Sequence, residues 1–345
     1  MPESLSEREL RVLEAVVQSY VESAEPVASR TVARRFGLGV SPATVRNAMS
    51  DLEEKGYLFH PHTSAGRVPT DRAYRLYVDA LMRSPSFSPA QEERLREDLI
   101  AEGSAISAII YRAAQVLSVL TQELGVAVAP ALDSVVLEHL DLVTIATDRL
   151  LLVLQLRSGL ARSVFVQVPG TLHPEAVAGI ALVLNERLAG LTLREIRQTL
   201  PERMRDTAKT SAESELLDIF VATGEQLFDV AGTAPEAVVI GRTSVLAEQP
   251  EFATGEKMRE LIELTEQREV LRRALEARTN SVGLTVTIGG ENESQSLSRL
   301  TLVTAPYHSG ALSGVIGVLG PTRMPYEKVV TLVEHTSKLV GDLLR

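Results

Sequence analysis

The sequence contains no cysteine among its 345 residues. That absence excludes disulfide bonds, thiolate nucleophiles and cysteine-ligated zinc sites, and it favours an intracellular location. The chain also lacks any apolar run near the roughly 18 residues that a membrane-spanning helix needs. Its first seven residues are acidic and polar, unlike a secretory signal sequence. We therefore expect a cytoplasmic protein with no membrane partner.

An excess of positive charge is missing as well, because 45 acidic residues outnumber 35 basic ones and leave a net charge of −10. Taken alone, that charge disfavours a nucleic acid partner, since Lys and Arg neutralise phosphates. The distribution of charge indicates otherwise. Residues 30–83 contain nine basic and five acidic side chains, so the acidic excess belongs to the rest of the chain. An acidic remainder would limit non-specific DNA binding.

Motifs for catalysis are absent too. The sequence has no phosphate-binding loop, no zinc-protease helix motif and no hydrolase nucleophile motif. His60 and His62 are close enough to suggest a metal site, but Pro61 separates them and no carboxylate lies near them in the sequence. A place in a β-hairpin is the favoured interpretation of this pair. We expect no catalytic residues, no metal and no cofactor, and so no enzyme.

What the sequence does contain is a short helix with clear start and stop signals. Ser41 can cap it, Pro42 suits its first turn, and Gly56 can end it in the left-handed conformation. Residues placed 100° apart give an inward apolar stripe of Val45, Ala48, Met49 and Leu52. The outward face carries Ser41, Thr44, Arg46, Asn47 and Ser50, whose donors and acceptors suit base edges and phosphates in a major groove. The alternative is an ordinary solvated helix face.

The neighbouring segments favour the DNA-binding interpretation. Residues 27–37 predict a second short helix ending at Gly37, and residues 6–22 predict a third helix with Ser6 as its cap. Residues 57–60 and 67–68 predict two strands joined by a turn. Three helices and a β-ribbon make a winged helix-turn-helix. Its wing would present the following residues near the tip, toward DNA backbone or minor groove: His62, Thr63, Ser64 and Arg67.

The rest of the chain predicts an α+β domain interrupted by an insertion. A Pro/Ser-rich linker at residues 84–90 is followed by a helical region that includes residues 105–124. Further helices are expected at residues 174–188, 211–228, 255–277 and 326–344. Strands are expected at residues 138–145, 150–156 and 163–168, as an antiparallel meander, and at residues 237–246, 283–288, 300–305 and 314–319.

Several runs of residues resemble one protein family. They are Thr-Val-Arg-Asn at 44–47, Asp-Leu-Glu at 51–53, His-Thr-Ser-Ala-Gly-Arg-Val-Pro-Thr at 62–70, Tyr-Arg-Leu-Tyr-Val-Asp at 74–79 and Gly-Val-Leu-Gly-Pro-Thr-Arg-Met-Pro-Tyr at 317–326. From about Leu10 to the C-terminus, the chain resembles the bacterial heat-inducible transcription repressors of chaperone operons, the HrcA type. The pattern departs from the family at Pro42, Ala48, Ala73 and Pro325.

The resemblance implies a multidomain α+β fold and a repressor function. It implies a winged-helix DNA-binding domain at residues 1–83, a linker at 84–90, and a GAF-like domain at 91–170 and 235–345. A mainly helical inserted dimerisation domain would occupy residues 171–234. It further implies a homodimer on an inverted-repeat operator of double-stranded DNA, with the chaperonin as the partner that keeps the repressor active during growth and is drawn away by heat stress.

The sequence allows more than one role for the apolar positions of the insert and for Arg323. Apolar positions in the expected insert could form either a dimer interface or a core: Ile180, Leu184, Leu188, Leu216, Ile219 and Phe220. Arg323 could form an anion or signal site, or could tie the last strand to the last helix. The alternative function is a metabolite-sensing winged-helix regulator whose ligand binds in the GAF-like domain.

Overall fold

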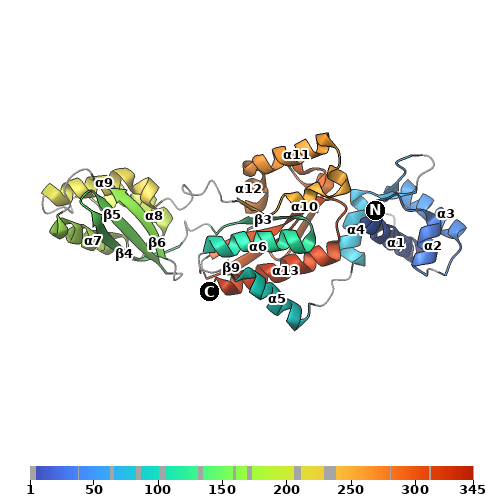
Figure 1. Ribbon diagram of the computed structural model, residues 1–345, viewed down its shortest axis with the longest axis horizontal. Helices are drawn as coiled ribbons and strands as arrows, with labels where there is room; N and C mark the ends of the chain where they lie inside the picture. The colour runs from blue at the N-terminus through green and yellow to red at the C-terminus, as the bar shows by residue number, and fades with distance from the viewer. Residues whose placement is uncertain are drawn as a thin grey trace. The chain divides into compact units, whose positions relative to one another are not determined.

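The computed structural model describes residues 5–37, 39–62, 66–82, 87–100, 106–130, 135–157, 161–168, 173–205, 211–228, 238–279, 281–310 and 312–344. These residues combine helices with three β-sheets (Figure 1). They divide into two units. Unit 1 comprises Met1–Val128, Val238–Tyr307 and Val315–Leu343, and unit 2 is formed mainly by Ala129–Ala237.

The N-terminal part of unit 1 contains three helices and a two-stranded sheet. The helices are α1 (Glu7–Ser23), α2 (Ser29–Arg35) and α3 (Pro42–Glu54), and the strands are β1 (Leu58–Phe59) and β2 (Val68–Pro69). The expected apolar stripe of α3 is buried. It shares a core with Val12, Leu13 and Val16 of α1. The helices at 6–22 and 41–55 and the β-ribbon are thus confirmed in kind and place.

A capping box begins α1 and also links it to α3. Ser6 Oγ accepts a hydrogen bond from the backbone N–H of Glu9, and the Glu9 carboxylate accepts one from the Ser6 N–H. The other Glu9 oxygen lies 2.6 Å from Lys55 Nζ, at the C-terminal end of α3. The Lys55 hydrogen bond is the main reason that the pKa of Glu9 is lowered. One buried carboxylate therefore positions two helices.

After the ribbon, α4 (Asp71–Leu76) continues directly into a π-helical turn, η1 (Tyr77–Leu81). Helices α5 (Pro89–Leu99) and α6 (Ile106–Thr121) follow. Ser88 caps α5 and Pro89 opens it, so the expected linker at 84–90 ends inside a helix. The Phe87 ring stacks on His335 at 4.3 Å between centroids, which fixes the entry to α5.

The central sheet of unit 1 has the strand order β7-β3-β10-β9-β8. Its strands are β3 (Leu124–Val128), β7 (Val238–Ile240), β8 (Thr285–Ile288), β9 (Leu300–Ser309) and β10 (Leu312–Pro321). β3 pairs antiparallel with both β7 and β10, and β8 pairs antiparallel with β9. Segments from before and after residues 129–237 therefore complete one sheet.

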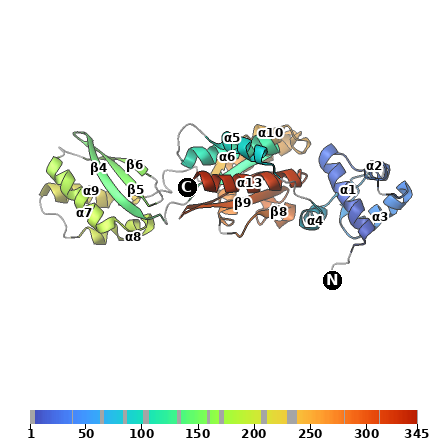
Figure 2. The ribbon, with the colours of Figure 1, turned by 90° about the horizontal axis from the view of Figure 1, so that it is seen from below.

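Helices cover both faces of this sheet. Helix α6 lies beside α13 (Tyr326–Leu343) on one face (Figure 2). The other face buries apolar side chains of α10 (Ser244–Ala247), α11 (Gly255–Glu266) and α12 (Arg268–Glu276). The helix expected over 255–277 is divided in two, because Gln267 has a ψ of 54° and leaves the helical region. The strand expected over 237–246 stops at Ile240, and a short helix follows.

Unit 2 contains a three-stranded antiparallel sheet with three helices. The strands are β4 (Leu137–Ala146), β5 (Arg149–Leu156) and β6 (Ala161–Gln167), in that order, so the expected meander is confirmed. The helices are α7 (Pro174–Leu188), α8 (Leu193–Arg203) and α9 (Ser211–Phe228). Helix α8 is capped by Thr192 and was not singled out in the sequence.

The meander belongs with the helices of unit 2, which differs from the domain boundary expected at residue 171. Asn185 of α7 accepts a hydrogen bond from the Leu140 N–H at 2.8 Å and donates to the Leu140 carbonyl at 2.6 Å. Leu152 and Leu154 of β5 are fully buried within the unit. The helices bury their apolar faces against this sheet, so the meander and the helices form one compact unit that begins at Ala129.

Candidate nucleic-acid interface

Helix α3 begins as its sequence predicts. Ser41 Oγ accepts a hydrogen bond from the Thr44 N–H at 3.1 Å and lies 3.0 Å from Thr44 Oγ1. Pro42 occupies the first turn. Gly56, just beyond the helix, has a φ of +77°, a conformation that glycine adopts without a steric penalty. Pro42 has no N–H and the Val45 N–H donates to the Ser41 carbonyl at 3.0 Å, so the first turn leaves the Ala43 N–H for an external anion.

The outward face of α3 is accessible. Ser41, Arg46 and Asn47 are exposed, and Thr44 and Ser50 are partly buried. Arg46 and Asn47 have no hydrogen-bond or ion-pair partner among the described residues. Their guanidinium and amide groups are therefore free to form new hydrogen bonds. This is the chemistry that reads guanine and adenine in a major groove.

Helix α2 adds cations that the sequence analysis did not single out. Arg30 and Arg34 are exposed on this helix. Arg35 instead pairs with Glu22 of α1. A signal was present in the sequence, because these residues supply three of the nine basic residues in 30–83. Exposed cations beside α3 suit contacts to phosphate.

The β-ribbon positions its candidate residues unequally. His62 is exposed. Thr63 and Ser64 lie outside the described residues. Arg67 directly precedes β2, and its backbone pairs with Val27. Its guanidinium lies 2.7 Å from Glu53 of α3, and the side chain is 13% exposed. Arg67 was expected near the tip, and this ion pair holds its side chain against α3.

Glu53 also contacts His60. Its carboxylate lies 2.8 Å from His60 Nδ1, although the sequence had indicated no nearby carboxylate. The fold brings them together because the ribbon returns along the C-terminal half of α3. Within the described part of the chain, no group of three His, Cys, Asp or Glu side chains could hold a metal ion. His60, Glu53 and Arg67 form a polar cluster that supports the ribbon.

Arg323 has neither of the two roles that its sequence suggested. Its Nε and Nη2 donate to the two Glu251 carboxylate oxygens at 2.5 and 2.9 Å, and its Nη1 donates to the Val21 carbonyl at 2.8 Å. The pKa of Arg323 is raised, chiefly by the hydrogen bonds to Glu251. The guanidinium therefore links the last turn of α1 to the central part of unit 1.

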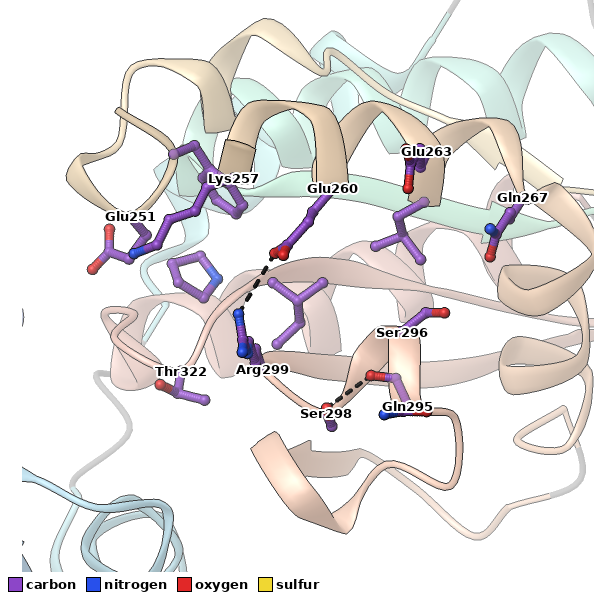
Figure 3. A pocket seen from close by; sticks show the side chains of 14 residues that line it. Glu251, Lys257, Glu260, Glu263, Gln267, Gln295, Ser296, Ser298, Arg299 and Thr322 are labelled. Carbon is purple, nitrogen blue, oxygen red and sulfur yellow. Dashed lines mark hydrogen bonds and ion pairs between the residues drawn. The ribbon is translucent and has the colours of Figure 1, made fainter. Parts of the chain in front are cut away.

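A pocket of about 470 Å³ lies beside this contact, between α11 and the loop before β9 (Figure 3). Phe252, Leu264 and Leu300 are buried apolar members of its wall. Charges of both signs surround it, and Arg299 lies 3.7 Å from Glu260 across the opening. Such a mixed lining suits a small molecule with both polar and apolar parts.

The C-terminal two thirds of the chain match one family model. Residues 107–330 match the model described as the HrcA protein C terminal domain. The chain belongs to the HrcA family.

Full-length relatives agree with that assignment. The chain is 38% identical over 352 residues to the heat-inducible transcription repressor HrcA of Chlorobium limicola, which covers 99% of this chain and 98% of that protein. It is 37% identical over 343 residues to HrcA of Geobacter sulfurreducens, with the same coverage. HrcA proteins are transcription repressors, so the expectation of a non-enzyme is confirmed by the family.

A solved structure shares the fold. The crystal structure of a protein described as hypothetical superposes with a TM-score of 0.69 at 22% identity, and the match covers 99% of both chains. That likeness concerns the fold alone. In the part of the chain that is described, no helix combines the length and apolar character needed to cross a bilayer.

Proposed function

We propose that this HrcA-family protein is a cytoplasmic, sequence-specific DNA-binding repressor of heat-shock chaperone operons. Its α1–α3 helices and β1–β2 ribbon serve as a winged helix-turn-helix, with α3 lying in the major groove. The central sheet and its helices serve as a GAF-like domain, and residues 129–237 form the insert. The observation that carries this proposal is the exposed Arg46–Asn47 pair, which has no side-chain partner in the described part of the chain and lies on a capped helix whose opposite face is buried.

Roles for the individual residues follow from their chemistry. Arg46 and Asn47 read base edges, because their side chains can form two hydrogen bonds with guanine and adenine respectively. Ser41, Thr44 and Ser50 contact phosphate or base edges from the same face. His62, Thr63 and Ser64 of the wing contact the backbone or minor groove. Arg67 acts by holding the wing against Glu53, a role supported by its 2.7 Å ion pair.

A homodimer on an inverted repeat is the second part of the proposal, because a two-fold protein matches a palindromic site. The apolar positions that could form either an interface or a core are mostly core residues of unit 2: Ile180, Leu184, Leu188, Leu216 and Phe220 are buried. The outer face of the meander is a better candidate. There Val143 is 49% exposed and Phe165 is 67% exposed, and both pair with Leu151 in adjacent strands.

The chaperonin is the proposed partner that keeps the repressor active. Accumulation of inactive repressor during heat stress, when unfolded proteins occupy the chaperonin, would raise transcription. A sensor of this kind needs only a marginally stable active form, since a small loss of stability changes the folded fraction several-fold.

The experiment that tests DNA reading is Arg46→Ala in the full chain. We expect binding to the inverted-repeat operator of the organism's own chaperonin operon to weaken by about 1–3 kcal/mol, because one pair of base contacts is lost. Binding to unrelated DNA should change much less. Fluorescence anisotropy with both DNAs measures the difference.

Arg272→Ala is the matched control, because Arg272 is a half-exposed arginine on α12 whose ion pairs to Glu269 and Glu276 stay within that helix. It should bind the operator as the wild type does. Unchanged discrimination by Arg46→Ala would remove Arg46 from the base-reading residues.

The pocket beside α11 supports one alternative, a regulator that senses a metabolite. Its apolar wall and surrounding charges of both signs favour a small dipolar molecule, such as a free amino acid. A thermal-shift screen of amino acids separates the two candidates. A rise in melting temperature at micromolar ligand, abolished by Leu264→Arg, would favour sensing, and no shift would favour the repressor without a ligand.

A further inference from the structure

Helix α4 is attached to the central sheet by a forked ion pair. Arg75 donates from Nε and Nη2 to the two Glu291 carboxylate oxygens at 2.8 and 2.5 Å. Its Nη2 also donates to the Val286 carbonyl of β8 at 2.6 Å, and its Nη1 lies 3.0 Å from Asp79. Two-point guanidinium–carboxylate contacts fix orientation as well as distance. Contacts to its own helical segment and to the central sheet therefore fix the orientation of the Arg75 side chain.

Two further polar contacts join the same parts. Arg323 bonds both Glu251 and the Val21 carbonyl, so it attaches the end of α1. Tyr77 donates from its hydroxyl to Glu327 of α13 at 2.9 Å. Together with the Arg75 pair, these contacts define what we call the joint: Val21, Arg75, Tyr77, Glu251, Glu291, Arg323 and Glu327.

Apolar and backbone packing close the space around the joint. The rings of Tyr74 and Tyr326 lie 5.7 Å apart, and both side chains are 1% exposed. The Gly290 N–H donates to Asp71 at 3.1 Å. Gly289 has a φ of +52°, and a Cβ there would lie 1.9 Å from Asp71 Oδ2. The approach of α4 to this turn is thus close enough to require glycine.

The joint is also coupled to α3. Thr70, the cap of α4, donates to the Gly56 carbonyl at 2.8 Å. Arg72 donates to the Lys55 carbonyl at 2.8 Å and lies over the Tyr57 ring at 4.4 Å. The end of α3, the ribbon and α4 therefore form one connected body. None of the seven residues of the joint belongs to α3, so the side chains proposed to read DNA take no part in it.

We propose that the joint is a positioning device that fixes the direction of α3 relative to the central sheet, and so selects one spacing of operator half-sites. This inference rests on the proposed function. Each recognition helix of a dimer must reach the groove at a fixed separation, and each extra base pair turns the second half-site by about 34°. A fixed joint holds the α3 helices of both copies in the orientation that binds. A loose joint lowers the effective concentration of the second α3 at its half-site, but it lets the dimer bind operators with a wider range of half-site spacings.

The test compares Arg75→Gln, Glu291→Gln and the double variant with the wild type. Three DNAs are used: the inverted repeat, the same repeat with about two base pairs added between the half-sites, and a single half-site. We expect each variant to bind the inverted repeat about tenfold more weakly and to lose most of the wild-type preference for its spacing. Half-site affinity should stay within about twofold of the wild type.

Glu291→Gln keeps every residue of the DNA-binding part native, so it separates positioning from damage to that part. The double variant should bind the inverted repeat no more weakly than Arg75→Gln alone, because the Arg75–Glu291 pair is already lost in that single variant. Arg272→Gln, which disturbs only contacts within α12, is the control and should retain the spacing preference.

The outcomes separate the joint from the proposed function. A wild type that fails to prefer the inverted repeat over unrelated DNA would overturn the proposed function itself. A wild type with a sharp spacing preference that all three variants keep would overturn the joint alone. Equal losses on the half-site and the inverted repeat would also overturn the joint, because they indicate general damage to DNA binding.

Discussion

The Tyr74 hydroxyl is a polar group buried with no hydrogen-bond partner among the described residues. Burial raises the pKa of this phenol well above its usual value, so the group stays neutral. A buried donor without a partner costs free energy that a phenylalanine would not. Tyr74 therefore stabilises the fold through the packing of its ring and not through its hydroxyl group.

We expect Tyr74→Phe to raise the free energy of unfolding by about 1 kcal/mol. Urea denaturation of the full chain measures it. Tyr326→Phe is the matched control, because the Tyr326 hydroxyl donates to the Thr322 carbonyl at 2.7 Å, so its loss should destabilise the protein. Equal destabilisation by the two variants would show that Tyr74 does have a partner.

Glu123 is a carboxylic acid buried to 2% exposure between α6 and β3. Gln249 Nε2 donates to it at 3.0 Å, and the absence of a side chain at Gly320 leaves room for it. Burial raises the pKa of Glu123 well above 4.5, and this effect exceeds the opposing influence of Gln249 and Arg323. The folded protein therefore binds this proton more tightly than the unfolded chain does.

The sign of the pH dependence follows. The stabilising effect of this proton is complete below the unfolded pKa of about 4.5 and is lost as pH rises through the higher folded value. We expect Glu123→Gln to reduce the loss of stability on going from pH 5 to pH 8. Thermal unfolding at both pH values tests this, with Glu276→Gln, an exposed carboxylate of α12, as control. A larger loss in Glu123→Gln than in the wild type would contradict the raised pKa.

At the scale of elements, the start of α3 depends on a single side-chain cap. Ser41 Oγ satisfies the Thr44 N–H, which no carbonyl within the helix can reach. Replacement of such a cap by alanine costs about 1 kcal/mol, whereas asparagine can replace it. The face of α3 that we propose reads DNA and the stability of the helix therefore both depend on Ser41.

We expect Ser41→Ala to lower the free energy of unfolding of the DNA-binding part by about 1 kcal/mol, and Ser41→Asn to change it little. Hydrogen exchange of the α3 amides gives the local value. Faster exchange in Ser41→Asn than in Ser41→Ala would be inconsistent with a capping role.

Apolar periodicity predicted the presence of helices better than it predicted where they end. Apolar spacing predicted one helix over 255–277, but two helices with a bend at Gln267 are present. Leu264 before the bend and Leu271 after it both reach the core on the sheet. Local sequence favours helix on both sides of Gln267, and contact with a twisted sheet decides where the axis must change direction.

At the scale of the whole molecule, the uncovered face of the meander leads to a prediction about assembly. Phe165, Val143 and Ile145 are at least 49% exposed on that face. Exposed apolar patches of this kind mark interaction surfaces. A second copy of the chain can bury them by two-fold pairing.

We expect Phe165→Asp to disrupt the proposed dimer and to give a monomer in sedimentation velocity at micromolar concentration, because a carboxylate would be buried without a partner. The melting temperature of the monomer should change little, since Phe165 is 67% exposed. Leu182→Asp is the control, because Leu182 is 68% exposed on α7. A dimer that persists in Phe165→Asp would exclude this face.

The sequence by itself determined the local structure and the chemistry that each element carries. Caps at Ser6 and Ser41, the stripe through Val45 and Leu52, and the apolar run of β5 depend only on nearby residues, so they could be recognised without coordinates. The exposed outward face of α3 followed from the same helical period. The motif runs at both ends of the chain indicated the family.

Tertiary structure alone decided what depends on residues far apart in the chain. It brought Glu53 to His60 and Arg67, moved the meander into unit 2, and joined Arg75 to Glu291 across 216 positions. The physical reason is that an ion pair or a buried face is specified by two partners, and the sequence around either one contains no information about the other.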